Sequence, residues 1–351
     1  MERYSKNLRP CLSELKPYVA GKGIQEIAKK YGFSPEEIVK LGSNENPYGP
    51  SPEVISAVSD VPFNIYPEPL EFIESAARYT GFEPSEILVG CGLDGVMDTL
   101  GRIFMDKGDF AIIPTPTFLF YELLTRLCGG RPIFMRRGPG FDLPGIMPDN
   151  SKMIFLCSPN NPTGNSILED RLREIVESTS AIVFVDEAYV EFADRSLIGL
   201  VREYENLIVG RTLSKAFGLA GLRIGYAVSP EWISKEYWRA SPPFTVTNVS
   251  LAAGCAALGD QDFMKRSVSK IRSERDRLKS CIPEAYPSDG NFLYIKTPEK
   301  SSKIAEELLK RGIIVRDCTS FRDSGEFHIR VTVGTPEQNR KFIEAYQEIC
   351  L

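Results

Sequence analysis

Two ionisable side chains stand where chemistry is expected, each shortly after an apolar run of strand type. Asp186 directly follows one such run, and Lys215 follows another among small residues and hydroxyls, with Arg211 and Arg223 flanking it. A buried carboxylate needs a partner, such as a metal ion, a helix N-terminus or a cationic ring nitrogen, although a simple N-cap is the alternative. A partly buried amine near other cations has a lowered pKa and can form a Schiff base. We therefore interpret Lys215 as a candidate reactive amine.

Two loops at other predicted strand ends could hold the rest of a ligand. Gly90-Cys91-Gly92-Leu93-Asp94-Gly95 matches GxGxxG, but the next strand ends in Ile113-Pro114-Thr115-Pro116 and lacks the acid that a dinucleotide site needs. We favour a phosphate cradle of backbone N–H groups at a helix N-terminus; a merely tight turn explains the motif alone equally well. Residues 158–164 contain two Asn and two Pro, which make a rigid loop whose amides could face a ligand, although a loop of ordinary turn residues explains this motif alone better.

Composition excludes several function classes. The 351 residues carry 42 Lys and Arg against 47 Asp and Glu, a net charge of −5, so no basic footprint for nucleic acid is present. No apolar run approaches membrane-spanning length, and we expect neither a signal peptide nor a membrane partner. The eight cysteines lack any CxxC spacing, which indicates reduced thiols in the cytoplasm. The one histidine, His328, lies in an alternating strand pattern, so neither a Ser-His-Asp triad nor a metal site is expected.

The elements that must position these residues alternate between strand and helix. Strands are predicted at 87–90, 110–114, 153–157, 182–185, 207–209 and 224–228. Helices are predicted near 70–79, 95–106, 168–178, 262–280, 301–311 and 336–349, and cap signals start others at Ser34 and Ser51.

This alternation predicts an α/β fold whose large domain is a doubly wound, mostly parallel sheet that carries the ligand. The last hundred residues, in which a polar helix near 262–280 leads to strands predicted around 292–295 and 326–333, predict a smaller α+β unit. The first 47 residues are too few to form a core and should pack on it. The expected division is 1–47, 48–245 and 246–351, with the large domain in the middle.

A phosphate cradle, an amide, a carboxylate and an amine, each at a strand end, describe a pyridoxal phosphate site. In such a site the aldehyde takes the lysine and the ring nitrogen takes the carboxylate. The chain resembles the fold-type I, aspartate-aminotransferase-like superfamily of pyridoxal phosphate enzymes in Ser158-Pro159-Asn160-Asn161-Pro162-Thr163-Gly164, Asp186-Glu187-Ala188-Tyr189, and Ser214-Lys215 with Arg223.

Over nearly its full length, the chain is similar to the histidinol-phosphate aminotransferase family of that superfamily. The motifs that carry this similarity are Leu15-Lys16-Pro17-Tyr18, Lys40-Leu41-Gly42-Ser43-Asn44-Glu45-Asn46-Pro47-Tyr48-Gly49-Pro50, Tyr66-Pro67-Glu68-Pro69, Ile314-Val315-Arg316-Asp317 and Ile329-Arg330-Val331-Thr332-Val333-Gly334.

The resemblance implies a role for each matching residue. Lys215 would hold the cofactor as a Schiff base and later move the substrate proton, and Asp186 would pair with the ring nitrogen. Tyr189 and Asn161 would hydrogen-bond the ring hydroxylate, and Phe118 would stack on the ring. The phosphate would be bound by Gly92, Leu93, Asp94, Ser214 and Arg223, and by Tyr66 of a neighbouring subunit, which implies a homodimer.

The resemblance also implies the substrates, histidinol phosphate and glutamate or 2-oxoglutarate. Arg330 would receive the anionic group of either substrate, with Arg316 as a second phosphate-binding arginine. Tyr18, Asn44 and Asn291 would be further substrate contacts. The chain departs from the family at Leu93 and Gly95, where relatives have a small residue and an acid. Leu93 can still donate its backbone N–H group.

Several alternatives stay open at this point. A threonine-phosphate decarboxylase-like enzyme or a broad aromatic or aspartate aminotransferase would use the same cofactor site. A nicotinamide-dependent oxidoreductase would instead use loop 90–95. A non-catalytic regulator of this fold would need a DNA-binding module, for which no segment is free.

Overall fold

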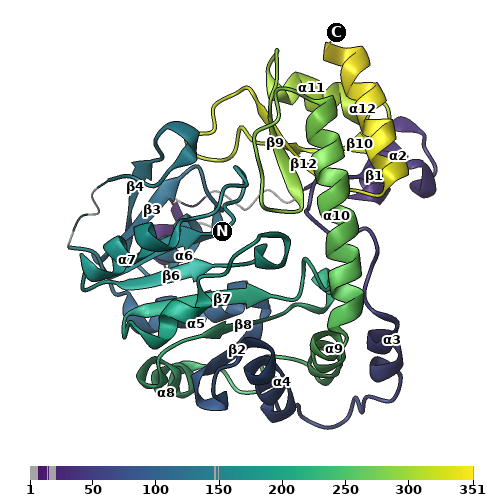
Figure 1. Cartoon of the computed structure of the whole chain (residues 1–351). Helices are drawn as coiled ribbons and strands as arrows, with labels where there is room; N and C mark the ends of the chain where they lie inside the picture. Colours follow the sequence, from purple (N-terminus) through teal and green to yellow (C-terminus); the bar gives the residue numbers. More distant parts are fainter. Residues whose placement is uncertain (1–6, 14, 16–20, 146–147, 149, 351) are drawn as a thin grey trace.

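The computed structural model describes residues 7–13, 15, 21–145, 148 and 150–350 (Figure 1). Its largest sheet has seven strands in the order β2-β8-β7-β6-β5-β3-β4. These are β2 (Ile87–Cys91), β3 (Phe110–Thr115), β4 (Arg131–Arg136), β5 (Met153–Cys157), β6 (Ile182–Asp186), β7 (Leu207–Thr212) and β8 (Ile224–Val228). Strand β8 is antiparallel to β2 and β7, and the other neighbours pair in parallel. The mostly parallel sheet is confirmed.

Helices cover both faces of this sheet, because alternate side chains of each strand point to opposite faces. In β6, Ile182 and Phe184 join one apolar cluster, and Val183 and Val185 join the other. The first cluster is covered by α5 (Gly92–Phe104), α6 (Phe120–Leu127) and α8 (Glu231–Ala240). The second is covered by α3 (Pro52–Ser59), α4 (Leu70–Thr80), α7 (Glu169–Glu177) and α9 (Asn248–Gly259). The doubly wound arrangement is therefore confirmed.

A smaller α+β part is built from both ends of the chain. Its three-stranded antiparallel sheet has the order β11-β12-β9, formed by β9 (Phe292–Lys296), β11 (Arg316–Asp317) and β12 (His328–Thr332). Strand β1 (Val39–Lys40) pairs in parallel with β10 (Ile313–Ile314). The accompanying helices are α2 (Ile24–Tyr31), α11 (Ser301–Leu309) and α12 (Pro336–Cys350).

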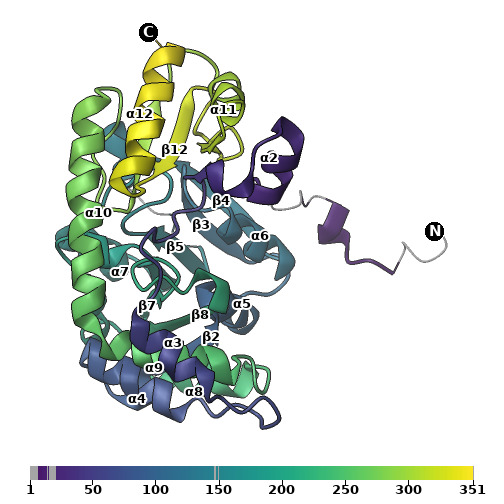
Figure 2. The same ribbon diagram turned by 90° about the vertical axis from the view of Figure 1, so that its right-hand side faces the viewer.

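One long helix, α10 (Gln261–Cys281), links the two parts. It runs from α9 beside the large sheet to α12 beside the small one, as the two views in Figures 1 and 2 agree. The remaining helical turns are short 3₁₀ segments at Pro10–Ser13, Pro35–Glu37, Pro84–Glu86, Pro139–Phe141, Val190–Phe192, Ile198–Arg202 and Ala220–Leu222. Across the described residues, no helix has the length and apolar character needed to cross a membrane.

The structure corrects several predicted elements. The cap at Ser34 opens only the 3₁₀ turn Pro35–Glu37, because the chain becomes extended at Ile38. The helix predicted near 95–106 begins earlier, at Gly92. Strand β4 and helices α2, α6, α8 and α9 were not predicted.

Candidate active site

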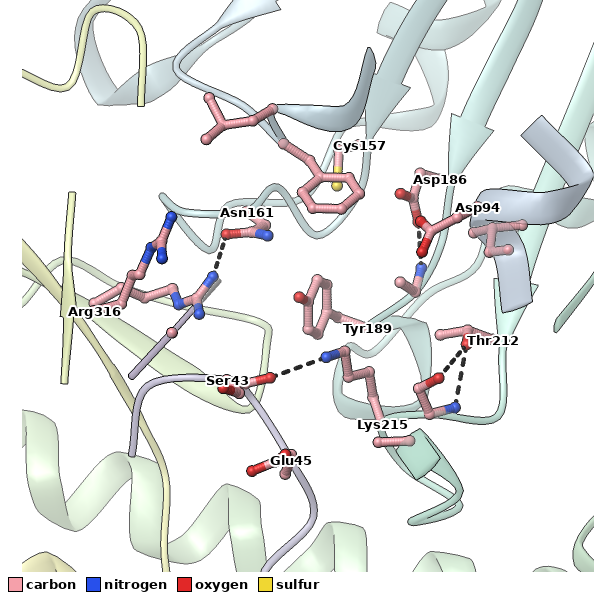
Figure 3. Close-up of a pocket in the computed structure, with 18 of the residues that line it drawn as sticks. Ser43, Glu45, Asp94, Cys157, Asn161, Asp186, Tyr189, Thr212, Lys215 and Arg316 are labelled. Atoms are coloured by element: carbon pink, nitrogen blue, oxygen red, sulfur yellow. Dashed lines mark hydrogen bonds between the residues drawn. The ribbon is translucent and has the colours of Figure 1, made fainter. Parts of the chain in front are cut away.

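A cavity of about 220 Å³ opens at the carboxyl ends of β5, β6 and β7, where ligands bind in sheets of this type. The large sheet contributes Asp186 and the Lys215 turn, and the small sheet contributes Arg316 and Arg330. Figure 3 shows Asp186, Lys215 and Arg316 around one space, with Tyr189 near its centre. Of the predicted site residues, those lining the cavity are Leu93, Asp94, Phe118, Asn161, Asp186, Tyr189, Ser214, Lys215, Arg223, Arg316 and Arg330.

Asp186 ends β6 and is held by two donors. Its Oδ1 accepts from the Ala188 backbone N–H group at 2.9 Å, and its Oδ2 accepts from the Tyr121 hydroxyl at 2.7 Å. Burial raises the pKa of Asp186 to about 6, against the opposing effect of these hydrogen bonds. The carboxylate is therefore mostly ionised at neutral pH and can pair with a cationic ring nitrogen.

Lys215 lies in the turn after β7 and points across the cavity toward Tyr189 (Figure 3). Its Nζ donates to the Ser43 carbonyl oxygen at 3.1 Å. Burial, and next the positive charge of Arg330, lower the pKa of Lys215 to about 8. A much larger fraction of this amine is neutral at pH 7 than of an exposed lysine, which favours reaction with an aldehyde.

The glycine-rich loop places the start of α5 at the cavity. Gly92 has φ +69° and donates its N–H group to the Arg223 carbonyl oxygen at 2.8 Å. A Cβ atom on Gly225 would lie 2.4 Å from the Leu93 nitrogen, so β8 can approach this loop so closely only because residue 225 is a glycine. Free N–H groups at a helix start, with Arg223 beside them, suit a phosphate.

The departure at Leu93 has a packing explanation. The Leu93 side chain belongs to the apolar cluster under α5, where its Cδ1 fills the space above Gly210. The side chain therefore packs in the core. The Leu93 backbone N–H group lies at the start of the helix and remains available to a ligand.

The two arginines lie opposite each other on neighbouring strands, because Arg316 of β11 pairs in register with Arg330 of β12. Arg330 donates from Nη1 to the Asn161 Oδ1 at 2.6 Å and from Nη2 to the Gly42 carbonyl oxygen at 2.7 Å. Arg316 donates from Nη2 to the Ser320 hydroxyl at 3.2 Å. Two nearly buried guanidinium groups at one end of a cavity form a strong site for an anion.

Segment 43–46 supports the site from behind. Asn44 donates from Nδ2 to the Tyr189 hydroxyl at 3.1 Å, and Asn291 donates from Nδ2 to the Asn44 carbonyl oxygen at 3.0 Å. Asn46 donates from Nδ2 to the Ala216 carbonyl oxygen at 2.8 Å. Asn44 and Asn291 are fully buried and do not line the cavity, so the structure places these predicted substrate contacts one layer back.

One predicted residue of the described part of the chain lies away from this chain's cavity. Tyr66 is 73% exposed and stacks on Phe244, with ring centroids 4.3 Å apart, away from the cavity. Tyr18 lies outside the described residues. Gly92 does not line the cavity itself, but its positive φ angle gives the loop the turn that brings Leu93 and Asp94 to the cavity.

Sequence reasoning missed several residues of the site. Cys157 and Thr212 end their strands, a signal that could have found them, and Tyr121 follows Phe118 by three positions in the first turn of α6. Tyr121 contacts Asp186 without lining the cavity; besides Cys157 and Thr212, the missed lining residues are Gly21, Gly42, Ser43, Glu45, Leu119, Ala188, Ala220 and Phe321.

The residues present fit pyridoxal phosphate. Lys215 supplies an amine with a lowered pKa, and Asp186 supplies a buried carboxylate for the ring nitrogen. The start of α5 supplies the phosphate cradle. Gly225 of β8 packs so closely against it that a Cβ atom at this position would clash with the Leu93 backbone nitrogen.

Comparison with known proteins then decides the family. The model of the family "Aminotransferase class I and II" matches residues 36–345. The chain belongs to this family. This aminotransferase is 52% identical over 347 residues to the histidinol-phosphate aminotransferase of Methanosarcina mazei, covering 95% of this chain and 94% of the relative. It is 45% identical over 322 residues to histidinol-phosphate aminotransferase 1 of Archaeoglobus fulgidus, covering 89% and 99%.

Solved structures share the fold of this aminotransferase. The histidinol-phosphate aminotransferase of Sinorhizobium meliloti, solved in complex with pyridoxal-5'-phosphate, superposes with a TM-score of 0.86 at 24% identity, covering 97% of this chain and 98% of that one. The L-threonine-O-3-phosphate decarboxylase of Porphyromonas gingivalis superposes with a TM-score of 0.79 at 22% identity, covering 89% and 99%. The predicted family resemblance is confirmed, and the nicotinamide interpretation of loop 90–95 is wrong.

Proposed function

We propose that this aminotransferase moves the amino group of L-histidinol phosphate to 2-oxoglutarate, giving imidazole acetol phosphate and glutamate in histidine biosynthesis. Its cofactor in this proposal is pyridoxal phosphate. The single observation that carries the proposal is the pairing of Arg316 and Arg330 at one end of a cavity whose other end holds Lys215 and Asp186. The names of the relatives at 52% and 45% identity support the same substrate.

Pyridoxal phosphate, when bound, supplies an electron sink for the bonds at the substrate Cα. Asp186 holds the proton on the ring nitrogen, because its carboxylate is buried and ionised at neutral pH. Lys215 Nζ would hold the aldehyde and, once released, would take the proton from the substrate Cα and deliver it to the C4′ carbon of the cofactor. Tyr189 and Asn161 would donate to the ring hydroxylate, and Phe118 would cover one face of the ring.

The anion end explains how one site accepts two unlike amines in turn. Histidinol phosphate has no α-carboxylate, and its CH2-phosphate arm takes that place. The planar guanidinium of Arg330 can bind either a phosphate or a carboxylate in a bidentate manner. Arg316 adds a second positive charge that suits the dianionic phosphate more than the single charge of a carboxylate.

A substrate panel tests this proposal. Purified enzyme, pyridoxal phosphate and 2-oxoglutarate are mixed with histidinol phosphate, aromatic amino acids, aspartate or threonine phosphate, and glutamate formation is measured. We expect the highest kcat/KM for histidinol phosphate. A far higher kcat/KM for an aromatic amino acid, or CO2 release from threonine phosphate without glutamate, would overturn the substrate assignment.

We also propose a homodimer in which Tyr66 reaches the phosphate of the neighbouring subunit's cofactor. Tyr66 is joined on the surface by other exposed apolar residues of the same segment, Phe63, Ile65 and Leu70, and by Phe244. An exposed apolar patch of this kind is typical of an interface. Sedimentation velocity should give a dimer, and Tyr66→Ala should weaken cofactor binding; a monomer with full cofactor affinity would contradict both parts.

The remaining assignments are also proposals. The division at 1–47, 48–245 and 246–351 is supported by the pairing of β1 with β10 and by the separate small sheet. A cytoplasmic location of the protein is supported by its eight cysteines, which all lie in the described residues and are all free thiols. Limited proteolysis and fractionation of cells would test these two points.

A further inference from the structure

Tyr121 makes a contact with Asp186 that the mechanism above leaves without a role. Its hydroxyl lies 2.7 Å from Asp186 Oδ2, and both side chains are buried. An ionised carboxylate can only accept hydrogen bonds, so the tyrosine O–H group is the donor. A hydrogen bond to a buried charge is among the stronger ones in proteins.

The tyrosine ring is fixed by its neighbours. It stacks on Phe155 of β5, with centroids 5.2 Å apart and planes 4° from parallel, and meets Phe118 edge to face at 5.6 Å. Its backbone N–H group donates to the Phe118 carbonyl oxygen at 3.4 Å. One turn of chain therefore carries both the predicted ring-stacking residue and the donor to Asp186.

The other groups near Asp186 have partners elsewhere. The Cys157 thiol donates to the Pro159 carbonyl oxygen at 3.3 Å, and Lys215 Nζ donates to Ser43. Asp94 is paired with Arg223 at 2.9 Å. The ionisable and charged groups facing Asp186 from the packed elements are Asp94 of α5, Tyr121 of α6, Cys157 of β5, and Tyr189 and Lys215 of the following turns.

We propose that Tyr121 is a positioning residue, which holds the carboxylate of Asp186 in place and in its ionised form so that it can keep the cofactor ring nitrogen protonated. This inference rests on the proposed function. The Ala188 N–H group fixes one carboxylate oxygen and Tyr121 the other, so the carboxylate cannot rotate away from the cavity without losing a hydrogen bond. The Tyr121 donor also counters the effect of burial on the pKa of Asp186.

The test uses Tyr121→Phe, which keeps both aromatic contacts and removes only the donor. Full-length apoprotein is titrated with pyridoxal phosphate over a range of pH, and binding is followed by cofactor absorbance, without any turnover. We expect the dissociation constant at neutral pH to rise by about tenfold. The pH below which affinity is lost should move upward by about one unit, because Asp186 loses a donor that stabilises its charged form.

Tyr237→Phe is the matched control, since it removes another buried tyrosine hydroxyl, which donates to the Val89 carbonyl oxygen at 2.9 Å and is outside the cavity. It should leave both the dissociation constant and its pH dependence unchanged. A second variant, Asp186→Asn, should abolish the effect of Tyr121→Phe when the two are combined, because the hydroxyl then has no carboxylate to act through.

The outcomes separate the two proposals. A wild-type protein that does not bind pyridoxal phosphate overturns the proposed function and this inference with it. Wild-type binding with an unchanged Tyr121→Phe overturns this inference alone. Equal weakening at every pH, an equal effect of Tyr237→Phe, or an effect that persists in the Asp186→Asn background would make Tyr121 merely structural and would also overturn it.

Discussion

The two ends of the active-site cavity are built in different ways. At the cofactor end, Asp186 and Lys215 come from neighbouring parallel strands of one buried sheet, and each sits at or just beyond a strand end. At the anion end, Arg316 and Arg330 come from a small antiparallel sheet and meet because their strands pair in register. The first end is positioned by chain topology, and the second by the pairing of a strand only two residues long.

This difference separates reactivity from substrate choice. The cofactor end is shared by every alternative pyridoxal phosphate enzyme considered above, since these enzymes differ only in which bond is broken or which side chain is accepted. The two arginines of the anion end are proposed to contact the substrate and not the cofactor. Changes at the two ends should therefore have separable effects on the cofactor and on the substrate, which the following variants test.

Lys215→Ala should have the largest effect. Without the amine that anchors the aldehyde and moves the Cα proton, kcat should fall by at least about 10³-fold. The absorbance of covalently bound cofactor should disappear as well. Lys235→Ala, an exposed lysine of α8, is the control and should behave as wild type. Residual turnover within tenfold of wild type would show that the cofactor end has been misassigned.

Arg330→Ala should come next. Arg330 is nearly buried, so its removal leaves the phosphate or carboxylate of the substrate without its positively charged partner. We therefore expect kcat/KM for histidinol phosphate and for 2-oxoglutarate to fall by about 10²-fold each. Cofactor absorbance should remain normal. Steady-state kinetics with each substrate and a spectrum of the purified variant decide the matter. Lost cofactor with an unchanged KM would mean that the two ends are not separable.

Arg316→Ala should have a smaller and more selective effect. We expect about a tenfold loss of kcat/KM for histidinol phosphate and less for 2-oxoglutarate, because the phosphate carries more negative charge. Arg322→Ala removes a nearby arginine that is 45% exposed and paired with Glu122, so it serves as the control. An equal loss for both substrates would show that Arg316 does not discriminate between the two anions.

The smallest effect concerns a coupling between the ends. Because the amine must be neutral to attack the aldehyde, the rate of cofactor attachment to wild-type apoprotein should rise with pH and level off above the Lys215 pKa of about 8. Arg330 lowers this pKa, since its positive charge disfavours the ammonium form. Arg330→Ala should therefore move the midpoint to higher pH. Stopped-flow absorbance measures it; a midpoint that stays or falls would contradict the assigned coupling.

The cofactor end could be predicted from the sequence because its residues are marked locally. Apolar runs identify buried strands, and a charged residue directly after such a run is conspicuous, as at Asp186. Tyr121 had no such mark, because its partner is 65 positions away and its helix was not recognised. Asn44 and Asn291 were predicted as substrate contacts, although long-range packing places them behind Tyr189.

The missed elements have physical reasons too. Strand β4 lies at the edge of the sheet, begins and ends with arginine and contains Pro132, so it lacks the pattern of a buried strand. Helix α9 is rich in small and apolar residues around its whole circumference and shows no amphipathic period. The pairing of β11 with β12 depends on a register that short strands do not reveal.

The segment from β1 to Asn46 has a consequence for how the protein is made. It pairs with β10, holds Tyr189 and contacts the Lys215 turn, so this segment precedes the large sheet in the sequence but pairs with a strand that follows it. A growing chain can begin to pair the strands of its large sheet while still on the ribosome, but the N-terminal segment must wait for its distant partner. A translation product that stops before β10 would therefore leave β1 without its pairing partner, and the strut behind the vitamin B6 pocket would have nothing to anchor it.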